Sequence, residues 1–101
     1  MTRQILIGID VGTTSTKAVV FDSQGNMLAE AHQEYGTAYP QPNWAEQNPE
    51  DWWQATCTVL NKLFSQNAID AHAVAGVGIS CQAPSLVAVD QQGRPLHPAL
   101  I

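Results

Sequence analysis

The stretch GIDVGTTSTKAVVFD, residues 8–22, constrains the fold of this chain more than any other part of it. Apolar residues of β-forming type lie on both sides of a centre, Gly12–Ser15, that consists of one glycine and three hydroxyl residues. Such a centre favours a tight turn, so the pattern predicts two strands over residues 4–9 and 16–21 joined as a hairpin. The turn-forming DSQGN and a third β-prone run over residues 27–34 extend this prediction to an antiparallel meander.

A helix is predicted after the meander, beyond a segment rich in Gly, Pro and Asn. Asn48 is a typical N-cap residue, Pro49 suits the first helical position, and the acidic residues 50 and 51 favour the positive end of a helix. Apolar residues then recur at helical spacing to about residue 65. The predicted apolar side of this helix comprises Trp53, Cys57, Leu60, Leu63 and Phe64.

Two more short strands are predicted after the helix. Residues 73–79, AVAGVGI, are continuously apolar and indicate a strand, and residues 85–89, SLVAV, indicate another. The sequence DQQGRP then predicts a turn before the last extended residues. The predicted order is therefore three strands, a helix, a strand and a further hairpin, which makes an α/β fold with a mixed sheet.

The composition argues against several classes of function. A chain of 101 residues with 4 basic side chains and a net charge of −5 is poorly suited to bind nucleic acid or acidic membrane surfaces. No apolar run approaches the roughly 20 residues that span a bilayer, and the N-terminus does not resemble a signal peptide. Cys57 and Cys81 match no CxxC motif, which indicates reduced thiols in a cytoplasmic protein. The scattered histidines lack ligand spacing, so no structural metal site is expected.

The residues of the first hairpin are typical of an anion-binding turn. Gly12 allows the backbone to approach a ligand closely. Thr13, Thr14 and Ser15 offer hydroxyl groups and consecutive amide donors. Asp10 is predicted at the end of a buried strand, where an unpaired carboxylate is costly, and it would repel a phosphate unless a divalent cation lay between them.

These residues support two interpretations. In the first, Asp10 is an outer ligand of a magnesium ion carried by a nucleotide, and Lys17 supplies a positive charge in the next strand. In the second, the loop is an ordinary hairpin whose Asp accepts backbone hydrogen bonds, as Asp often does in turns. The DxGTT pattern alone leaves both open.

A family resemblance favours the first interpretation. The stretch IGIDVGTTSTKAVVFD resembles the first phosphate-binding hairpin of the superfamily of sugar kinases, heat-shock ATPases and actin. Three further stretches, YPQPNWAEQNPEDWW, VAGVGISCQ and LVAVDQQGRPLHPALI, resemble the FGGY family of carbohydrate kinases in the same order and at similar spacing. The resemblance covers essentially the whole chain. It implies a ribonuclease H-like (actin-like ATPase) fold, with glycerol kinases, xylulokinases and ribulokinases as relatives.

The resemblance also implies an activity and roles for the hairpin residues. The implied activity is transfer of the γ-phosphoryl group of ATP to a hydroxyl of a sugar or polyol, with ATP and Mg²⁺ as cofactors. Asp10 is implied to be catalytic and to lie near the metal and the transferred group. Similar glycerol kinases carry an Arg at the position of Lys17, so a cation is retained there. The implied phosphate-binding residues are Gly12, Thr13, Thr14, Ser15 and Lys17.

The residues that follow the strand VAGVGIS bear on the acceptor. In the family, the two residues after a glutamine at this position help to define the sugar, and they are Arg-Glu in glycerol kinases and Met-His in xylulokinases. Here Gln82 is followed by Ala83 and Pro84, which bring no polar side chain to the implied substrate site. The difference predicts that glycerol is not the acceptor and argues against a standard xylulokinase, and the small side chains would admit a bulkier or less polar acceptor. The family resemblance as a whole implies a sugar or polyol as the acceptor, with a ketose of pentulose type as the expected substrate.

The resemblance implies that residues 1–101 form the first part of an N-terminal kinase domain. The general base, the adenosine pocket and the second domain of such kinases would lie beyond residue 101, so these residues alone are expected to be inactive. A homodimer is compatible with this assignment. The alternative function is a non-enzymatic domain that uses an actin-like fold for self-association, with Leu100 and Ile101 as an unpaired edge that pairs with another copy.

Overall fold

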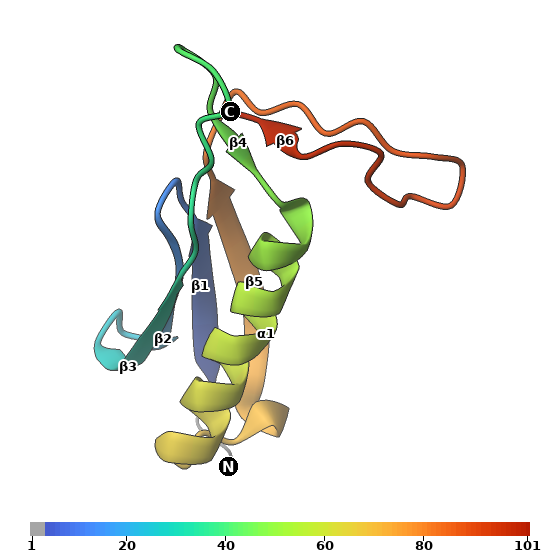
Figure 1. Cartoon of the computed structure of the whole chain (residues 1–101). Helices are drawn as coiled ribbons and strands as arrows, with labels where there is room; N and C mark the ends of the chain where they lie inside the picture. The colour runs from blue at the N-terminus through green and yellow to red at the C-terminus, as the bar shows by residue number, and fades with distance from the viewer. Residues whose placement is uncertain (1–3) are drawn as a thin grey trace.

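The main sheet of the protein has four strands and contains the first hairpin (Figure 1). The structure, a computed structural model, describes residues 4–101. The strands β1 (Ile5–Val11), β2 (Ser15–Asp22) and β3 (Met27–Glu34) form the predicted antiparallel meander, and β5 (Val74–Cys81) pairs parallel with β1. The strand order is therefore β3-β2-β1-β5, which confirms the predicted mixed sheet.

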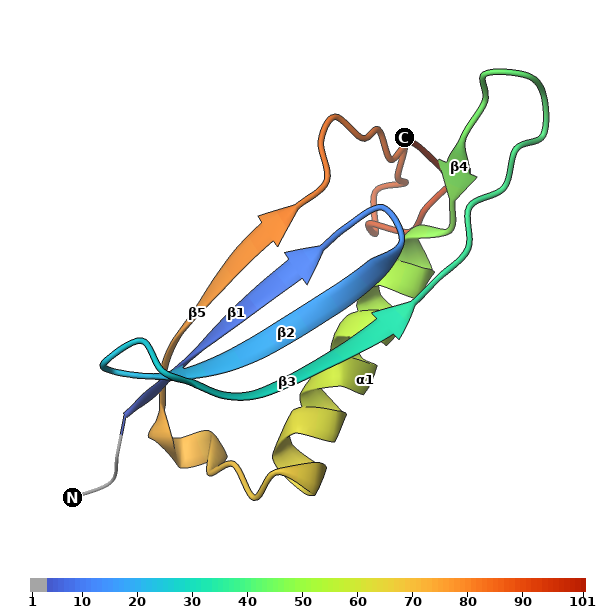
Figure 2. The same ribbon diagram turned by 90° about the vertical axis from the view of Figure 1, so that its left-hand side faces the viewer.

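One long helix lies against one face of this sheet (Figure 2). This helix, α1, spans Pro49–Gln66 and begins as predicted, because the side chain of Asn48 accepts a hydrogen bond from the Glu50 N–H at 3.0 Å. A short 3₁₀ turn, η1 (Ala71–Ala73), leads from α1 into β5. The order β-β-β-α-β thus agrees with the sequence prediction.

The core lies between α1 and the strands of the meander. Side chains alternate along β1 and β2, so every second residue of each strand faces the helix. The helix contributes residues spaced by four positions, which share one side of it. The buried core cluster consists of Ile5, Ile7, Ile9, Ala18, Val20, Ala29, Val59 and Leu63.

The predicted apolar side of α1 is partly wrong. The buried residues of the helix are Ala55, Val59 and Leu63, whereas Trp53, which was predicted on the apolar side, is 63% exposed. The helix packs mainly on β2 and β3 and does not extend over β5, so the side of α1 that carries Trp53 has no strand to cover it. Periodicity located the helix, but its orientation on the sheet decided which side is buried.

A second, very small sheet joins the residues just before α1 to the last residues of the chain. It consists of β4 (Glu46–Gln47) and β6 (Ala99–Leu100), which pair antiparallel. Leu100 also exchanges hydrogen bonds with Leu86, and the Ile101 N–H donates to the carbonyl of residue 45 at 3.1 Å. The expectation that Leu100 and Ile101 form an unpaired edge is therefore wrong, because both pair with their own chain.

The segment after β5 forms a projecting loop in place of the predicted strand over residues 85–89 (Figure 1). Isolated bridges join Leu86 to Leu100 and Val89 to Pro95, but they do not continue into a ladder. Leu86 and Val89 are 62% and 50% exposed, so no buried face stabilises extended pairing here. The prediction of a strand was wrong because β-propensity acts only where a neighbouring surface packs against the side chains.

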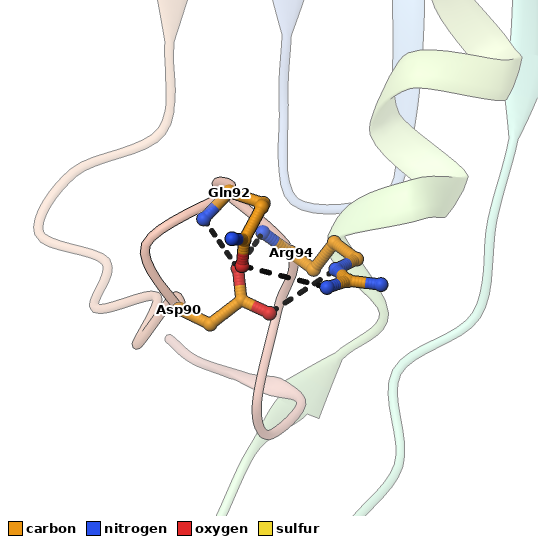
Figure 3. A network of polar contacts seen from close by, with 3 residues as sticks. All are labelled: Asp90, Gln92 and Arg94. Carbon is orange, nitrogen blue, oxygen red and sulfur yellow. Dashed lines mark hydrogen bonds and ion pairs between the residues drawn. The ribbon is translucent and has the colours of Figure 1, made fainter.

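The turn predicted within this loop is present and is organised by one carboxylate (Figure 3). Asp90 accepts hydrogen bonds from the backbone N–H groups of Gln92 and Arg94, both at 2.9 Å, and from the Arg94 Nε at 3.1 Å. Gly93 adopts a positive φ of 80°, which glycine tolerates. The turn is therefore specified locally, although the strands beside it are not.

Cys57 and Cys81 are free thiols, as predicted. Among residues 4–101, no helix has the length and apolar character that a membrane span requires.

Candidate functional site

Asp10 lies near the end of β1, on the face of the main sheet opposite α1. The isoleucines of β1 point into the core, so alternation directs Asp10 to the other face. Its neighbours in register are Lys17 of β2 and Ser80 of β5. The prediction that Asp10 occupies a buried position is wrong, because Asp10 is exposed. Within residues 4–101, α1 covers only the opposite face of the sheet (Figure 2). An exposed carboxylate keeps its hydration and needs no partner to offset burial.

An open hollow of about 450 Å³ adjoins Asp10. Gly8 and Gly78, which are adjacent in register, line it together with Lys17 and Ser80. A Cβ atom at Gly78 would meet no atom within 4 Å, so the backbone of β5 is accessible there. The hollow thus offers a carboxylate, an ammonium group and bare backbone to a ligand.

Lys17 contacts an acidic neighbour but remains accessible. Its Nζ lies 3.4 Å from Oε2 of Glu30, and the two side chains are 53% and 51% exposed. Exposed ion pairs of this kind contribute at most about 1 kcal/mol, because water and salt screen them. An anion in the hollow can therefore compete for Lys17 at small cost.

The turn between β1 and β2 is closed by a hydrogen bond from the Gly12 N–H to the Ser15 carbonyl at 2.9 Å. A Cβ atom at residue 12 would come within 3.2 Å of that carbonyl oxygen, which explains the glycine. Thr13 and Thr14 at the tip are exposed. The turn is therefore tight, and its tip is open to solvent.

The carbonyl groups of this turn accept hydrogen bonds from side chains that lie elsewhere in the sequence. The Gly12 carbonyl accepts from the Tyr35 hydroxyl at 2.6 Å and from Gln82 Nε2 at 3.0 Å. The Thr13 carbonyl accepts from Gln47 Nε2 at 2.6 Å. In a trans peptide the next N–H points away from the carbonyl, so the N–H groups of Thr13 and Thr14 point away from these donors. The turn thus directs consecutive N–H groups outward, as an anion-binding turn requires.

Tyr35 combines a hydrogen bond to the turn with a shifted pKa. Burial raises the pKa of Tyr35 above the ordinary value of 10.0, the hydrogen bond from the Thr16 hydroxyl lowers it, and the charge of Asp10 raises it. Because burial is the largest of these effects, the pKa is raised overall. The phenol therefore stays protonated at neutral pH and continues to donate to the Gly12 carbonyl.

The sequence prediction did not include Tyr35, Gln47 or Trp52 among the functional residues. Gln47 is 2% exposed and also accepts a hydrogen bond from the Trp52 indole Nε1 at 2.8 Å. Tyr35 directly follows β3, Gln47 lies in β4 and Trp52 lies in α1, and only the tertiary structure brings them to the turn. The available signal was the position of Gln47 and Trp52 within the family-like stretch YPQPNWAEQNPEDWW.

The predicted substrate residues follow β5 directly. The Gln82 N–H continues the parallel pairing by donating to the Val11 carbonyl at 2.8 Å, so the segment begins beside the turn. Ala83 and Pro84 are exposed and line an open groove of about 720 Å³ together with Trp52. The structure thus brings the predicted donor and acceptor residues to the same end of the sheet. Ligands of α/β proteins commonly bind beyond this end of parallel strands.

The residues of the site also limit the kind of metal centre that this part of the chain can form. Within residues 4–101 there is no group of three or more His, Cys, Asp or Glu side chains arranged to hold a metal ion. Asp10 is the carboxylate of the hollow, so an ion there would take its remaining ligands from other sources.

Comparison with known proteins identifies the family. A sequence model described as "FGGY family of carbohydrate kinases, N-terminal domain" matches residues 5–101. The chain belongs to the FGGY family of carbohydrate kinases. A glycerol kinase of Xanthomonas euvesicatoria pv. vesicatoria (strain 85-10) is 38% identical over 102 aligned positions, which cover 100% of this chain and 20% of the relative. The chain thus spans about a fifth of the length of this curated relative.

Solved structures of the family share the fold. The "xyloylose kinase" of Brucella ovis superposes with a TM-score of 0.92 at 31% identity, over 97% of this chain and 21% of that one. A Plasmodium falciparum glycerol kinase solved with ADP superposes with a TM-score of 0.82 over 98% of this chain and 20% of that one. Its identity of 20% shows a shared fold alone. The predicted ribonuclease H-like, actin-like ATPase fold is thereby confirmed.

Proposed function

We propose that this chain forms the phosphate-binding part of an ATP-dependent kinase that acts on a sugar or polyol. The observation that carries the proposal is the turn after β1. The carbonyl groups of Gly12 and Thr13 accept hydrogen bonds from Tyr35, Gln47 and Gln82, so the N–H groups of Thr13 and Thr14 point away from these donors. Outward N–H groups at a tight turn bind phosphate oxygens.

The proposed nucleotide contacts follow from this geometry. Thr13 and Thr14 would donate backbone N–H groups and hydroxyls to the terminal phosphates of ATP. Lys17, which borders the hollow, would neutralise part of the phosphate charge after it exchanges Glu30 for the ligand. The proposed set of phosphate-binding residues is Gly12, Thr13, Thr14, Ser15 and Lys17.

A magnesium ion fits the donor set at Asp10. Mg²⁺ prefers hard oxygen ligands and commonly takes only one or two carboxylates from the protein, with phosphate oxygens and water as its other ligands. The exposed carboxylate of Asp10 next to hydroxyl side chains meets this requirement. When bound, the ion would stabilise the charge that develops on the transferred phosphoryl group. Asp10 would hold and orient it.

The acceptor is proposed to bind along the segment 82–84. Ala83 and Pro84 are exposed in the groove and provide no hydrogen-bonding side chain. Such a site has no side chain at these two positions to recognise the hydroxyl pattern of glycerol, which argues against glycerol as the acceptor. The likeness to the Brucella ovis "xyloylose kinase" supports a ketose of pentulose type as substrate. The 38% identity to a glycerol kinase supports the wider substrate class of sugars and polyols. Glycerol must therefore be included when the acceptor is tested.

A panel of acceptors tests the proposal. The protein as its gene encodes it would be assayed with Mg²⁺·ATP and matched concentrations of pentuloses, hexuloses, glycerol and other polyols. We expect ATP-dependent phosphorylation with the highest kcat/KM for a ketose. A preference for glycerol would contradict the proposed acceptor class, and no phosphorylation of any acceptor would contradict the kinase itself.

We also propose that residues 1–101 are the first part of a longer cytoplasmic kinase. The support is that the chain spans 20% of its curated relative. Residues 1–101 alone are expected to show no phosphorylation in the same assay. Activity of these residues alone would contradict this part of the proposal.

A further inference from the structure

Gln47 is a buried side chain whose hydrogen-bonding capacity is fully used. Its Nε2 donates to the Thr13 carbonyl at 2.6 Å and to the Thr37 hydroxyl at 2.9 Å. Its Oε1 accepts from Trp52 Nε1 at 2.8 Å and from Gln82 Nε2 at 3.0 Å. Two donors and two acceptor positions are thereby all occupied on a residue that is 2% exposed.

Trp52 determines which way the Gln47 amide points. An indole Nε1–H can only donate, so the atom of Gln47 that faces it must be the oxygen. The amide nitrogen then faces the Thr13 carbonyl, which can only accept. The reverse orientation would place two donors together and two acceptors together inside the protein, which is costly because both would remain unsatisfied.

The side chain of Gln82 also donates a hydrogen bond to the turn after β1. Both hydrogens of its Nε2 are used, one toward the Gly12 carbonyl and one toward Gln47 Oε1, each at 3.0 Å. The amide cannot donate to an acceptor sugar without releasing the turn. Although Gln82 adjoins the groove, its side-chain donors therefore serve the nucleotide side.

We infer that Gln82, Gln47 and Trp52 form a positioning cluster that sets the peptide orientation of the phosphate-binding turn. The inference rests on the proposed function and deepens it, because it assigns Gln82 to nucleotide binding, whereas Ala83 and Pro84 border the acceptor. The cluster holds the carbonyls of Gly12 and Thr13 inward. Without these bonds the turn can rotate its N–H groups away from the phosphates.

The test compares nucleotide and acceptor kinetics in three variants of the protein as its gene encodes it. Gln82→Met keeps the length of the side chain but removes both donors. Gln47→Glu keeps the acceptor oxygens but removes the donors to Thr13 and Thr37. Trp52→Phe removes the indole donor and keeps an aromatic ring. We expect each to raise the KM for ATP about tenfold, while the KM for the acceptor changes by less than about twofold.

Matched variants outside the cluster serve as controls. Gln54 is exposed on α1, so Gln54→Met and Gln54→Glu repeat the two glutamine substitutions away from the turn. Trp44 is 49% exposed, so Trp44→Phe repeats the aromatic substitution. The controls should keep the wild-type KM values. A KM for ATP within about twofold of wild type in Gln82→Met would overturn the inference, as would a larger effect on the acceptor than on ATP.

A second measurement does not depend on kinase activity. The Trp52 indole proton, observed by NMR, should exchange slowly with solvent in the wild type and in Gln47→Glu, which keeps an acceptor for it. It should exchange faster in Gln82→Met, which loosens the cluster around Gln47 Oε1, whereas the exposed Trp44 should exchange fast in all. If Gln47→Glu does not fold, Gln82→Met decides, because Gln82 is only half-buried. A wild type without phosphorylation of any acceptor contradicts the proposed function and this inference with it. An active wild type with unaffected variants contradicts the inference alone.

Discussion

Asp10 illustrates how position along a strand sets the chemistry of a side chain. One place earlier, Ile9 is buried in the core, while Asp10 faces the hollow on the opposite side of the sheet. Lys17 lies beside it in register. The carboxylate is therefore free to take part in ligand binding, which an acid buried under α1 would not be.

Substitution Asp10→Asn tests the role of this carboxylate. The amide has the same shape but lacks the charge that would hold a metal ion, so kcat should fall about 100-fold or more while the acceptor KM changes only a few-fold. Steady-state kinetics at saturating Mg²⁺·ATP measure both. Asp51→Asn, in the first turn of α1, is the control and should retain activity. A kcat within a few-fold of wild type in Asp10→Asn would show that Asp10 is structural.

Tyr35 makes stability depend on pH in the alkaline range. Its pKa is raised in the folded protein above 10.0, chiefly by burial, so the folded state holds the phenolic proton more tightly than the unfolded state. The contribution is fully present below pH 10.0 and is lost as pH rises through the folded-state pKa. Denaturant titrations at increasing pH should therefore show a smaller alkaline loss of stability in Tyr35→Phe than in wild type. Equal alkaline losses of stability in the two proteins would show that Tyr35 is not the cause of the pH dependence.

At the scale of elements, α1 shows how far a local pattern reaches. The cap, the proline and the acidic first turn lie next to one another in sequence, and they begin the helix where the pattern indicated. Its buried side depends on packing against β2 and β3, which are distant in sequence. The start of a helix is a local property, whereas its orientation is not.

Removal of the N-cap side chain tests whether local residues determine where α1 begins. Asn48→Ala leaves the Glu50 N–H without its side-chain acceptor, which should lower the free energy of unfolding by about 1 kcal/mol. Asn48→Asp retains an acceptor oxygen and should stay within about 0.5 kcal/mol of wild type. Chemical denaturation followed by circular dichroism measures both. Equal stability of the Ala and Asp variants would mean that the cap does not contribute.

At the scale of the whole molecule, the described chain is elongated. Its radius of gyration is 15.8 Å and its extents are 54 × 29 × 22 Å, whereas a compact chain of this size has a radius of about 13 Å. The projecting loop after β5 contributes to this shape (Figure 1). Helix α1 does not extend over β5, and Val77 and Ile79 on this strand are 55% and 72% exposed. Stability is therefore concentrated between α1 and the meander.

Two substitutions test this distribution. Leu63 is fully buried on the side of α1 that faces the meander, so Leu63→Ala should lower the free energy of unfolding by about 2–5 kcal/mol. Ile79→Thr keeps a β-branched residue at an exposed position and should change the free energy of unfolding of residues 1–101 by less than about 0.5 kcal/mol. Denaturant titration of residues 1–101 compares them directly. Similar losses in both variants would contradict a core confined to α1 and the meander.

The hairpin, the helix start and the element order could be predicted because each depends on neighbours in sequence. Gly12 closes a tight turn, Asn48 caps the following helix, and the three strands of the meander follow one another with short connections. The strand predicted over 85–89 failed because nothing packs against it. Local preference is sufficient only where the fold supplies a partner surface.

By itself, the sequence determined the family, the order of the elements and the residues of the turn after β1, because these are carried by contiguous patterns. Only the tertiary structure decided that Asp10 is exposed, which side of α1 is buried, and that Tyr35, Gln47 and Gln82 converge on one turn. Tyr35 follows β3, Gln47 lies in β4 and Gln82 follows β5, so the three side chains come from parts of the chain that are distant in sequence. Hydrogen bonds between such distant residues depend on how the elements pack, which no local pattern encodes.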